Sequence, residues 1–249
     1  MKILLKISFV GSSYCGWQAQ NNGKTVQQTL TDAANKLFGF ECDITGSSRT
    51  DSGVHANMFC ATVCKKKEGS IETTIPVSNI PRAINCFLPD DISVFEATLV
   101  PDDFHARYSV KYKEYIYKMY TRPERDAFFS GRVWHIPKKL DVEAMNAAAK
   151  LFVGKHDFAA FMAQGSKITE TERTVFEADV TRDGDMIIFR VSADGFLYNM
   201  VRIMAGTLVD VGEGRIKPCD IETIIRGLDR SCAGRTAPAQ GLYLNKVVY

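Results

Sequence analysis

Residues 46–57 read Gly-Ser-Ser-Arg-Thr-Asp-Ser-Gly-Val-His-Ala-Asn and place the polar side chains of Arg49, Thr50, Asp51 and His55 in one short, turn-prone run. The glycines and serines allow a sharp turn and the close approach of a ligand. Arg49 and the hydroxyls of Thr50 and Ser52 flank Asp51 and would favour its ionised form. An ionised aspartate here can be a nucleophile or a base, or it can form an Asx turn that only shapes the loop. His55 leads directly into an apolar strand pattern and is more typical of a structural histidine.

The segments on either side of this stretch show strand and helix patterns. Thr25 and Gln28 form a capping box at the start of one helix, and Gly39 stands where its C-terminal cap belongs. Strands are expected at 2–10, 58–64 and 92–97. A second helix is expected to start at Pro76, to end before Pro89, and to carry Ile80, Ile84 and Phe87 on one face.

The second half of the chain repeats this plan after a turn-rich segment at 99–107. A strand containing Tyr115 and Tyr117 precedes a helix that Asp141 caps and Gly154 closes. Strands are predicted at 173–181, 186–193 and 241–249, and helices at 200–211 and 220–226. Asp183-Gly184 is a strong hairpin signal between the first two of these strands. The pattern predicts an α+β protein with a mainly antiparallel sheet, divided near residue 103.

Composition limits the classes of protein that this chain can belong to. It has 249 residues, 45% of them hydrophobic, and 31 basic against 29 acidic side chains, so any attraction to a polyanion requires local clustering. The seven cysteines show no paired framework, which favours reduced thiols; Cys60 and Cys64 alternate with apolar residues and are expected to be buried. The N-terminus lacks a signal-peptide pattern and no stretch reaches membrane-spanning length, so we expect a soluble, unexported protein.

Two further patterns could carry function. Arg202 lies in a stretch, 198–209, that is apolar on nearly all sides, so its guanidinium needs a partner such as Asp51 unless it reaches solvent along the helix. Tyrosines and lysines interleave at 111–120, which suits base stacking and phosphate contact as well as it suits a strand with one buried face. Other basic residues could extend a phosphate track or could simply be solvated: Arg82, Arg107, Arg122, Arg125, Lys138 and Lys139. Dinucleotide, phosphate-loop and zinc-deaminase motifs are absent from the sequence.

Residues 48–56 closely resemble the signature of TruA-type tRNA pseudouridine synthases. The resemblance extends over essentially the whole chain, because six further segments match that family in the same order. Ser48 stands where many members have glycine, and Ser52 where many have alanine; neither change removes a group that the chemistry needs. The six segments are 14–20, 104–107, 115–117, 157–158, 199–202 and 237–244.

The resemblance implies roles for individual residues. Asp51 matches the catalytic aspartate, Tyr115 the tyrosine that packs against the target base, and Arg202 the arginine that pairs with the aspartate. Arg49 is similar to the arginine that helps take the uridine out of its stack, and Arg107 lies in a matching segment as a further substrate-binding candidate. The reaction is an isomerisation of uridine to pseudouridine that needs no metal and no organic cofactor.

The resemblance also implies an architecture and a substrate. The implied fold has two α+β subdomains, 1–103 with the Asp51 loop and 104–249 with Tyr115 and Arg202. They share a mainly antiparallel sheet with helices packed on it and a central catalytic cleft. The implied substrate is the anticodon arm of tRNA at uridines 38, 39 and 40, bound by a cytoplasmic homodimer. Alternatives are a non-catalytic tRNA-binding protein or chaperone on the same fold, and a nucleoside glycosidase, which would want a second carboxylate near Asp51.

Overall fold

The computed structural model describes residues 1–166 and 168–249, which form two compact units. Unit 1 contains residues 1–111 and 244–249, and unit 2 contains residues 112–243. Within unit 1, the rings of Phe104 and Tyr249 have centroids 4.9 Å apart, and the Tyr249 hydroxyl donates to the Ala106 carbonyl at 2.8 Å. These contacts are the reason that residues 104–111 and 244–249 pack in unit 1, whereas the sequence analysis divided the chain at residue 103.

Unit 1 is built on a sheet with the strand order β4-β1-β3-β10, and β2 also pairs with β3. Strand β1 runs antiparallel to both of its neighbours. Ile3, Leu5 and Ile7 alternate along β1 with exposures of 0 to 1%, so this strand forms the centre of the core. The strands are β1 (Lys2–Phe9), β2 (Cys42–Gly46), β3 (His55–Lys65), β4 (Ile92–Val100) and β10 (Leu242–Val248), of which residues 244–248 belong to this unit. Strand β2 was not predicted.

Helix α1 (Val26–Phe38) begins and ends where the sequence predicted. The Thr25 side chain accepts the Gln28 N–H, and Gly39 adopts the left-handed conformation with φ of 74°. The Gln28 side-chain Nε2 donates to the Asp32 carboxylate, one turn further along the helix, at 2.8 Å.

Helix α2 (Ile80–Asn85) ends earlier than the sequence predicted. Ile80 and Ile84 are fully buried, but Phe87 is 44% exposed and does not share their face. The reason is Asn85, whose side-chain amide exchanges two hydrogen bonds with the main chain of Val94 on β4, at 2.8 and 2.9 Å. This exchange fixes the end of the helix against the sheet before the chain reaches Phe87.

The strands of unit 2 follow the order β5-β9-β8-β7 with antiparallel pairing, and the short strand β6 runs parallel to β5. The predicted hairpin is confirmed around Asp183-Gly184. Gly154 has φ of 120° and begins β7, whereas it was expected to close the preceding helix. The strands are β5 (Tyr112–Tyr120), β6 (Trp134–His135), β7 (Gly154–Asp157), β8 (Glu172–Asp183) and β9 (Met186–Ala193), and β6 and β7 were not predicted.

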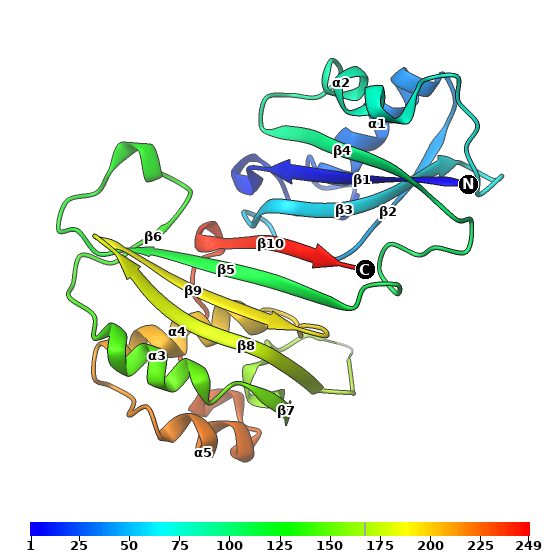
Figure 1. The fold of residues 1–249 in the computed structure, drawn as a ribbon. Helices are drawn as coiled ribbons and strands as arrows, with labels where there is room; N and C mark the ends of the chain where they lie inside the picture. Colours follow the sequence, from blue (N-terminus) through cyan, green and yellow to red (C-terminus); the bar gives the residue numbers. More distant parts are fainter. Residues whose placement is uncertain (167) are drawn as a thin grey trace. The chain divides into compact units, whose positions relative to one another are not determined.

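The helices of unit 2 are α3 (Val142–Lys150), α4 (Met200–Gly212) and α5 (Asp220–Gly227). Figure 1 shows α3 and α4 on the same side of the strands of this unit. Every residue of α4 except Arg202 is buried, which confirms the prediction of a buried helix. The predicted α+β class with mainly antiparallel strand pairing is confirmed.

Two predictions about cysteines and membranes can be compared with the structure. Cys60 and Cys64 are free and buried on β3, as expected. In residues 1–166 and 168–249, no helix is both long enough and apolar enough to cross a membrane. The same described ranges contain no group of three or more His, Cys, Asp or Glu side chains placed to hold a metal ion.

Candidate active site

The loop that joins β2 to β3 packs against residues 11–17 of the same unit. The Trp17 N–H donates to the Thr50 carbonyl at 3.1 Å, and the Ser52 hydroxyl donates to the Tyr14 carbonyl at 3.1 Å. The Val54 N–H closes a turn on the Asp51 carbonyl at 3.2 Å. Two distant stretches of sequence therefore build one rigid loop around Asp51.

Glycines make this close packing possible. A Cβ on Gly11 would lie 1.9 Å from the Val54 carbonyl oxygen, and one on Gly16 would lie 2.5 Å from the Thr50 carbonyl oxygen. Gly16 also has φ of 83°, which disfavours any other residue. Hence the 14–20 segment and the 48–56 segment depend on each other sterically.

Within this loop Arg49 is exposed and Asp51 is half-buried. The expectation that the neighbouring hydroxyls support Asp51 is wrong: Ser52 donates to Tyr14, and the buried Thr50 Oγ1 has no hydrogen-bond partner among the described residues. His55 is 1% exposed, and its Nδ1 accepts the Gly11 N–H at 3.0 Å. It therefore has the structural role that was predicted for it.

Arg107 lies in a second loop of unit 1. It is exposed, and its guanidinium carbon is 5.9 Å from the ring centroid of Tyr108, which is itself 77% exposed. The Nδ1 atom of His105 accepts the N–H groups of Arg107 and Tyr108, at 3.1 and 3.3 Å. The loop thus presents an aromatic ring beside a cation, which suits contact with a nucleic acid.

In unit 2, Tyr115 and Tyr117 are both buried on β5, at 6% and 0% exposure. Tyr115 makes an edge-on contact with Phe196, with ring centroids 5.0 Å apart. The Tyr117 hydroxyl donates to the Pro238 carbonyl at 2.7 Å, and burial raises the pKa of Tyr117 above its ordinary value. Tyr117 is therefore a core residue, and Tyr115 is the candidate that remains on this strand.

Arg202 is half-buried near the start of α4 and is held by two groups of its own unit. Its Nε donates to the Ala237 carbonyl at 2.8 Å, and its Nη1 donates to the Asn199 side chain at 2.7 Å. Asn199, the residue just before the start of α4, takes the left-handed conformation with φ of 59°. These partners orient the guanidinium, and the sequence analysis, which considered a carboxylate partner, missed both of them. The only feature of the sequence that singled out Ala237 and Asn199 was that both lie in segments that resemble the family.

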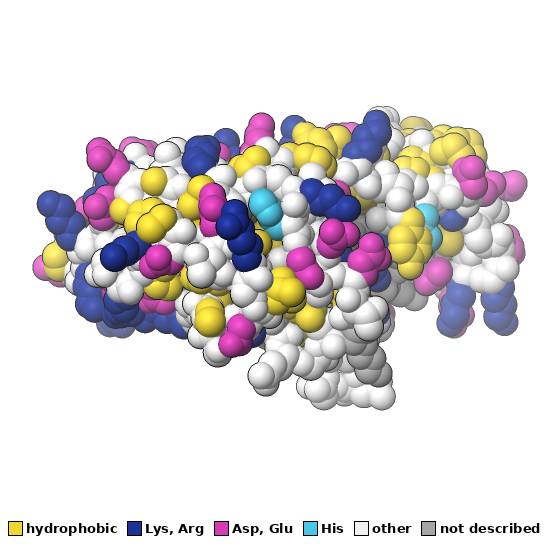
Figure 2. All heavy atoms as spheres, turned by 90° about the horizontal axis from the view of Figure 1, so that it is seen from below, with side chains coloured by type: hydrophobic (Ala, Val, Ile, Leu, Met, Phe, Trp, Pro, Cys, Tyr) yellow, Lys and Arg dark blue, Asp and Glu magenta, His cyan; other side chains and the backbone are white. Residues whose placement is uncertain are grey.

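The five candidates thus fall into two groups. Arg49, Asp51 and Arg107 belong to unit 1, and Tyr115 and Arg202 belong to unit 2. The pairing of Asp51 with Arg202 stays a prediction. Basic and acidic side chains are mixed over most of the face in Figure 2, in keeping with the net charge of +2.

Comparison with known proteins adds what the geometry alone does not decide. The family model for tRNA pseudouridine synthase matches residues 6–109 and 148–249. The tRNA pseudouridine synthase A of Caldicellulosiruptor saccharolyticus is 44% identical over 247 residues, covering 99% of each chain. That of Ruminiclostridium cellulolyticum is 45% identical over 249 residues, covering 100% of this chain and 99% of the relative.

A chain of a solved Cbf5-Nop10-Gar1 complex also matches, with a TM-score of 0.36 and 11% identity, over 83% of this chain and 45% of the other. A likeness at that level carries no argument. The full-length relatives and the family model confirm the family resemblance seen in the sequence. The chain belongs to the tRNA pseudouridine synthase family, a family of isomerases.

Proposed function

We propose that this chain converts uridine to pseudouridine at positions 38, 39 and 40 in the anticodon stem and loop of tRNA. The observation that carries the proposal is the full-length similarity to enzymes named tRNA pseudouridine synthase A. The rigid loop that presents Asp51 supports it, because a catalytic carboxylate must be held in position.

The proposed reaction breaks the bond between C1′ and N1, turns the uracil, and forms a bond between C1′ and C5. The C5 proton is lost to solvent and N1 gains a proton, so the product is an isomer of the substrate. One carboxylate is sufficient: Asp51 either attacks C1′ to give an ester, or removes the 2′ proton to give a glycal. The reaction needs no metal and no organic cofactor.

The other candidates have roles in binding and orientation. Taking a base out of its stack costs a few kcal/mol, which contacts to an extruded base can offset. Arg49 is exposed and assists this step, and Tyr115 packs against the uracil. Arg202 pairs with Asp51, and its bonds to Ala237 and Asn199 support this role because they orient the guanidinium.

The way in which the enzyme recognises the tRNA can be inferred from its target positions, because one active site has to act on three adjacent uridines. Such breadth favours recognition of RNA shape and backbone over base readout. With a net charge of +2, the protein needs locally clustered cations, among them Arg107, and a homodimer would assemble a larger basic surface. Binding should weaken as salt is raised, and sedimentation at micromolar concentration should give a dimer; a monomer would remove the two-subunit surface.

The test uses tRNA that lacks the modification and carries tritium at C5 of its uridines. The wild-type protein should release tritium, and Asp51→Asn should reduce the release to background while tRNA binding persists. Asp43→Asn is the matched control, because Asp43 is an exposed carboxylate on β2 of the same unit. If the wild type binds tRNA but releases no tritium, the non-catalytic tRNA-binding alternative replaces the isomerase.

A further inference from the structure

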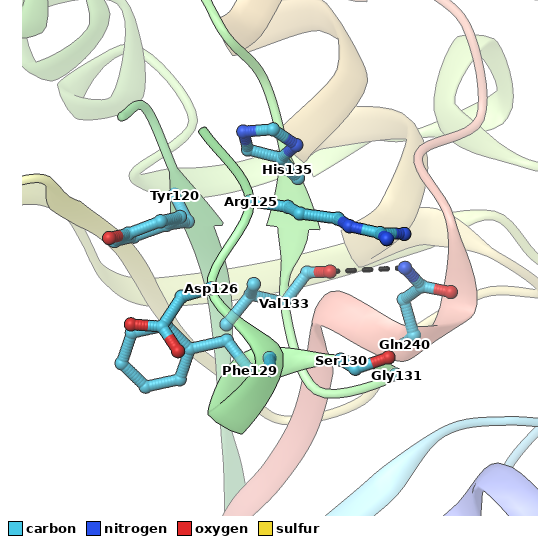
Figure 3. A pocket seen from close by; sticks show the side chains of 10 residues that line it. Tyr120, Arg125, Asp126, Phe129, Ser130, Gly131, Val133, His135 and Gln240 are labelled. Carbon is cyan, nitrogen blue, oxygen red and sulfur yellow. Dashed lines mark hydrogen bonds between the residues drawn. The ribbon is translucent and has the colours of Figure 1, made fainter. Parts of the chain in front are cut away.

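A pocket of about 560 Å³ opens in unit 2 where the chain leaves β5 and returns to β6. Its walls include Tyr120 at the end of β5, Arg125, Phe129 and Ser130 from the connecting segment, and His135 and Gln240 (Figure 3). All of these residues except Gln240 lie outside the stretches that the family model matches. The family model therefore does not cover most of the pocket wall.

The walls of the pocket are fixed by bonds from side chains to the main chain. The Gln240 amide donates to the Val133 carbonyl at 3.1 Å, the contact drawn in Figure 3. The Tyr243 hydroxyl donates to the Arg132 carbonyl at 2.6 Å. At the other end, a ring nitrogen of His135 lies 2.8 Å from the Arg122 carbonyl oxygen. Because both ends of the segment are anchored, the pocket is formed before any ligand arrives.

The lining combines aromatic surface with a cation and hydrogen-bonding groups. The rings of Tyr120 and Phe129 meet edge-on with centroids 5.1 Å apart. Arg125 is exposed, and its side chain extends in Figure 3 toward the side of the pocket where Gln240 lies. Aromatic rings that contact a base, a guanidinium that meets a phosphate, and an amide are the groups that bind unpaired nucleotides. A volume of about 560 Å³ is in the range for small-molecule sites.

The charge around the pocket favours a polyanion over an apolar or protein partner. Between residues 118 and 139 the chain has six Lys and Arg side chains and only two Asp and Glu side chains. One of the two, Asp126, lines the pocket, where its carboxylate accepts the Phe128 N–H at 2.9 Å. The whole chain, in contrast, has a net charge of +2. The neighbouring Tyr120 side chain raises the pKa of the Arg122 guanidinium above its ordinary value. Phe128, 87% exposed beside Phe129, adds a further ring at the edge of this segment.

The pocket is also continuous with the segment that holds a proposed site residue. The Ala237 carbonyl accepts a hydrogen bond from the Arg202 guanidinium. Gln240, three residues further along the chain, lines the pocket. Between them the Pro238 carbonyl accepts the Tyr117 hydroxyl at 2.7 Å. One short, rigid segment thus contributes both to the orientation of Arg202 and to the pocket wall.

We propose that this pocket binds one unpaired nucleotide of the RNA substrate other than the target uridine, with its base against the Tyr120 and Phe129 rings and its phosphate at Arg125. The inference rests on the proposed function, because it assumes that the substrate is RNA. The pocket would hold the RNA in register while the target uridine is outside the stack.

The test compares Arg125→Ala with Arg226→Ala. Arg226 is a matched control because its side chain is 81% exposed on α5 of the same unit and outside the pocket. At constant ionic strength, Arg125→Ala should weaken tRNA binding about tenfold and Arg226→Ala less than twofold. Phe129→Leu, which keeps an apolar side chain without the ring, should weaken binding about threefold. Single-turnover tritium release at saturating tRNA should stay within twofold of wild type for Arg226→Ala.

Further measurements separate other occupants and the proposed function itself. Free adenosine or uridine monophosphate should not bind the wild type at micromolar concentration. Micromolar binding that Arg125→Ala abolishes without changing tRNA affinity would overturn the RNA assignment in favour of a free nucleotide. If Arg125→Ala sediments differently from the wild type but binds tRNA with the same affinity, the pocket is an interface between protein chains and not an RNA site. If both arginine variants release tritium normally and bind tRNA with equal affinity, the pocket proposal is overturned and the proposed function is not. If the wild-type protein releases no tritium, the proposed function itself is overturned.

Discussion

Arg202 and Ala237 bind each other in both directions: the Arg202 Nε donates to the Ala237 carbonyl at 2.8 Å, and the Ala237 N–H donates to the Arg202 carbonyl at 3.0 Å. The reciprocal pair fixes both the side chain of Arg202 and the segment that leads into β10. A charged group that is half-buried needs such partners, because burying it without them is costly. These hydrogen bonds also fix the orientation of the Arg202 guanidinium.

The first prediction concerns Arg202. Arg202→Met should lower single-turnover tritium release at least about 100-fold while changing tRNA affinity less than threefold, since the residue is proposed to act on Asp51 and not on RNA binding. Arg202→Lys keeps the charge but loses the fork that reaches Ala237 and Asn199, so it should recover only a small part of the rate. An unchanged rate in Arg202→Met would show that Arg202 does not act on Asp51.

The second prediction concerns Gly206 in α4. A Cβ at this position would lie 1.7 Å from the Arg235 carbonyl oxygen, so Gly206→Ala must push the 233–237 segment away from the helix. We expect a loss of about 3 kcal/mol in the free energy of unfolding, measured by urea denaturation. Gly227→Ala on α5, where nothing lies within 4 Å of the added Cβ, should be neutral or slightly stabilising. Equal stability of the two variants would contradict the close packing.

The third prediction concerns Thr50, whose buried Oγ1 has no hydrogen-bond partner in residues 1–166 and 168–249. Thr50→Val removes the unsatisfied hydroxyl and keeps the shape, so the free energy of unfolding should rise by about 1 kcal/mol. The control is Thr25→Val, because the Thr25 hydroxyl caps α1 and its loss should cost about 1 kcal/mol. A destabilised Thr50→Val would indicate that a bound water satisfies this hydroxyl.

The fourth prediction concerns the thiols. Cys42, Cys60 and Cys64 are buried and the other four cysteines are exposed, so a thiol reagent at pH 8 should label four cysteines rapidly and three only after unfolding.

The buried thiols also predict how stability depends on pH. Burial raises the pKa of Cys42 and of Cys60 from about 9 to about 11. Between pH 9 and 11 these thiols keep their protons in the folded state and lose them in the unfolded state. The free energy of unfolding is therefore at its full value below pH 9 and falls as the pH rises toward 11. The double variant Cys42→Ala, Cys60→Ala should therefore lose less stability between pH 9 and 11 than the wild type does.

Local signals in the sequence were strong enough to predict most of the elements. The caps at Thr25 and Gly39, the hairpin at Asp183-Gly184 and the apolar stretch of α4 act between near neighbours in the chain, and each element formed where it was predicted. The errors arose where a distant partner decided the outcome. Asn85 ended α2 by bonding to β4, and this bond could not be read from the periodicity of the helix.

The sequence by itself determined the family, the α+β class and the identity of the candidate residues, because motifs and periodicity are local properties of the chain. Only the tertiary structure showed that Asp51 sits on a loop whose main chain is bound by residues 11–17, and that Arg202 is held by a carbonyl. It also showed the pocket between Tyr120 and Gln240. These features depend on main-chain atoms brought together across long stretches of chain. A main-chain carbonyl or N–H is present at almost every residue, so nothing in the sequence marks which one will be a partner.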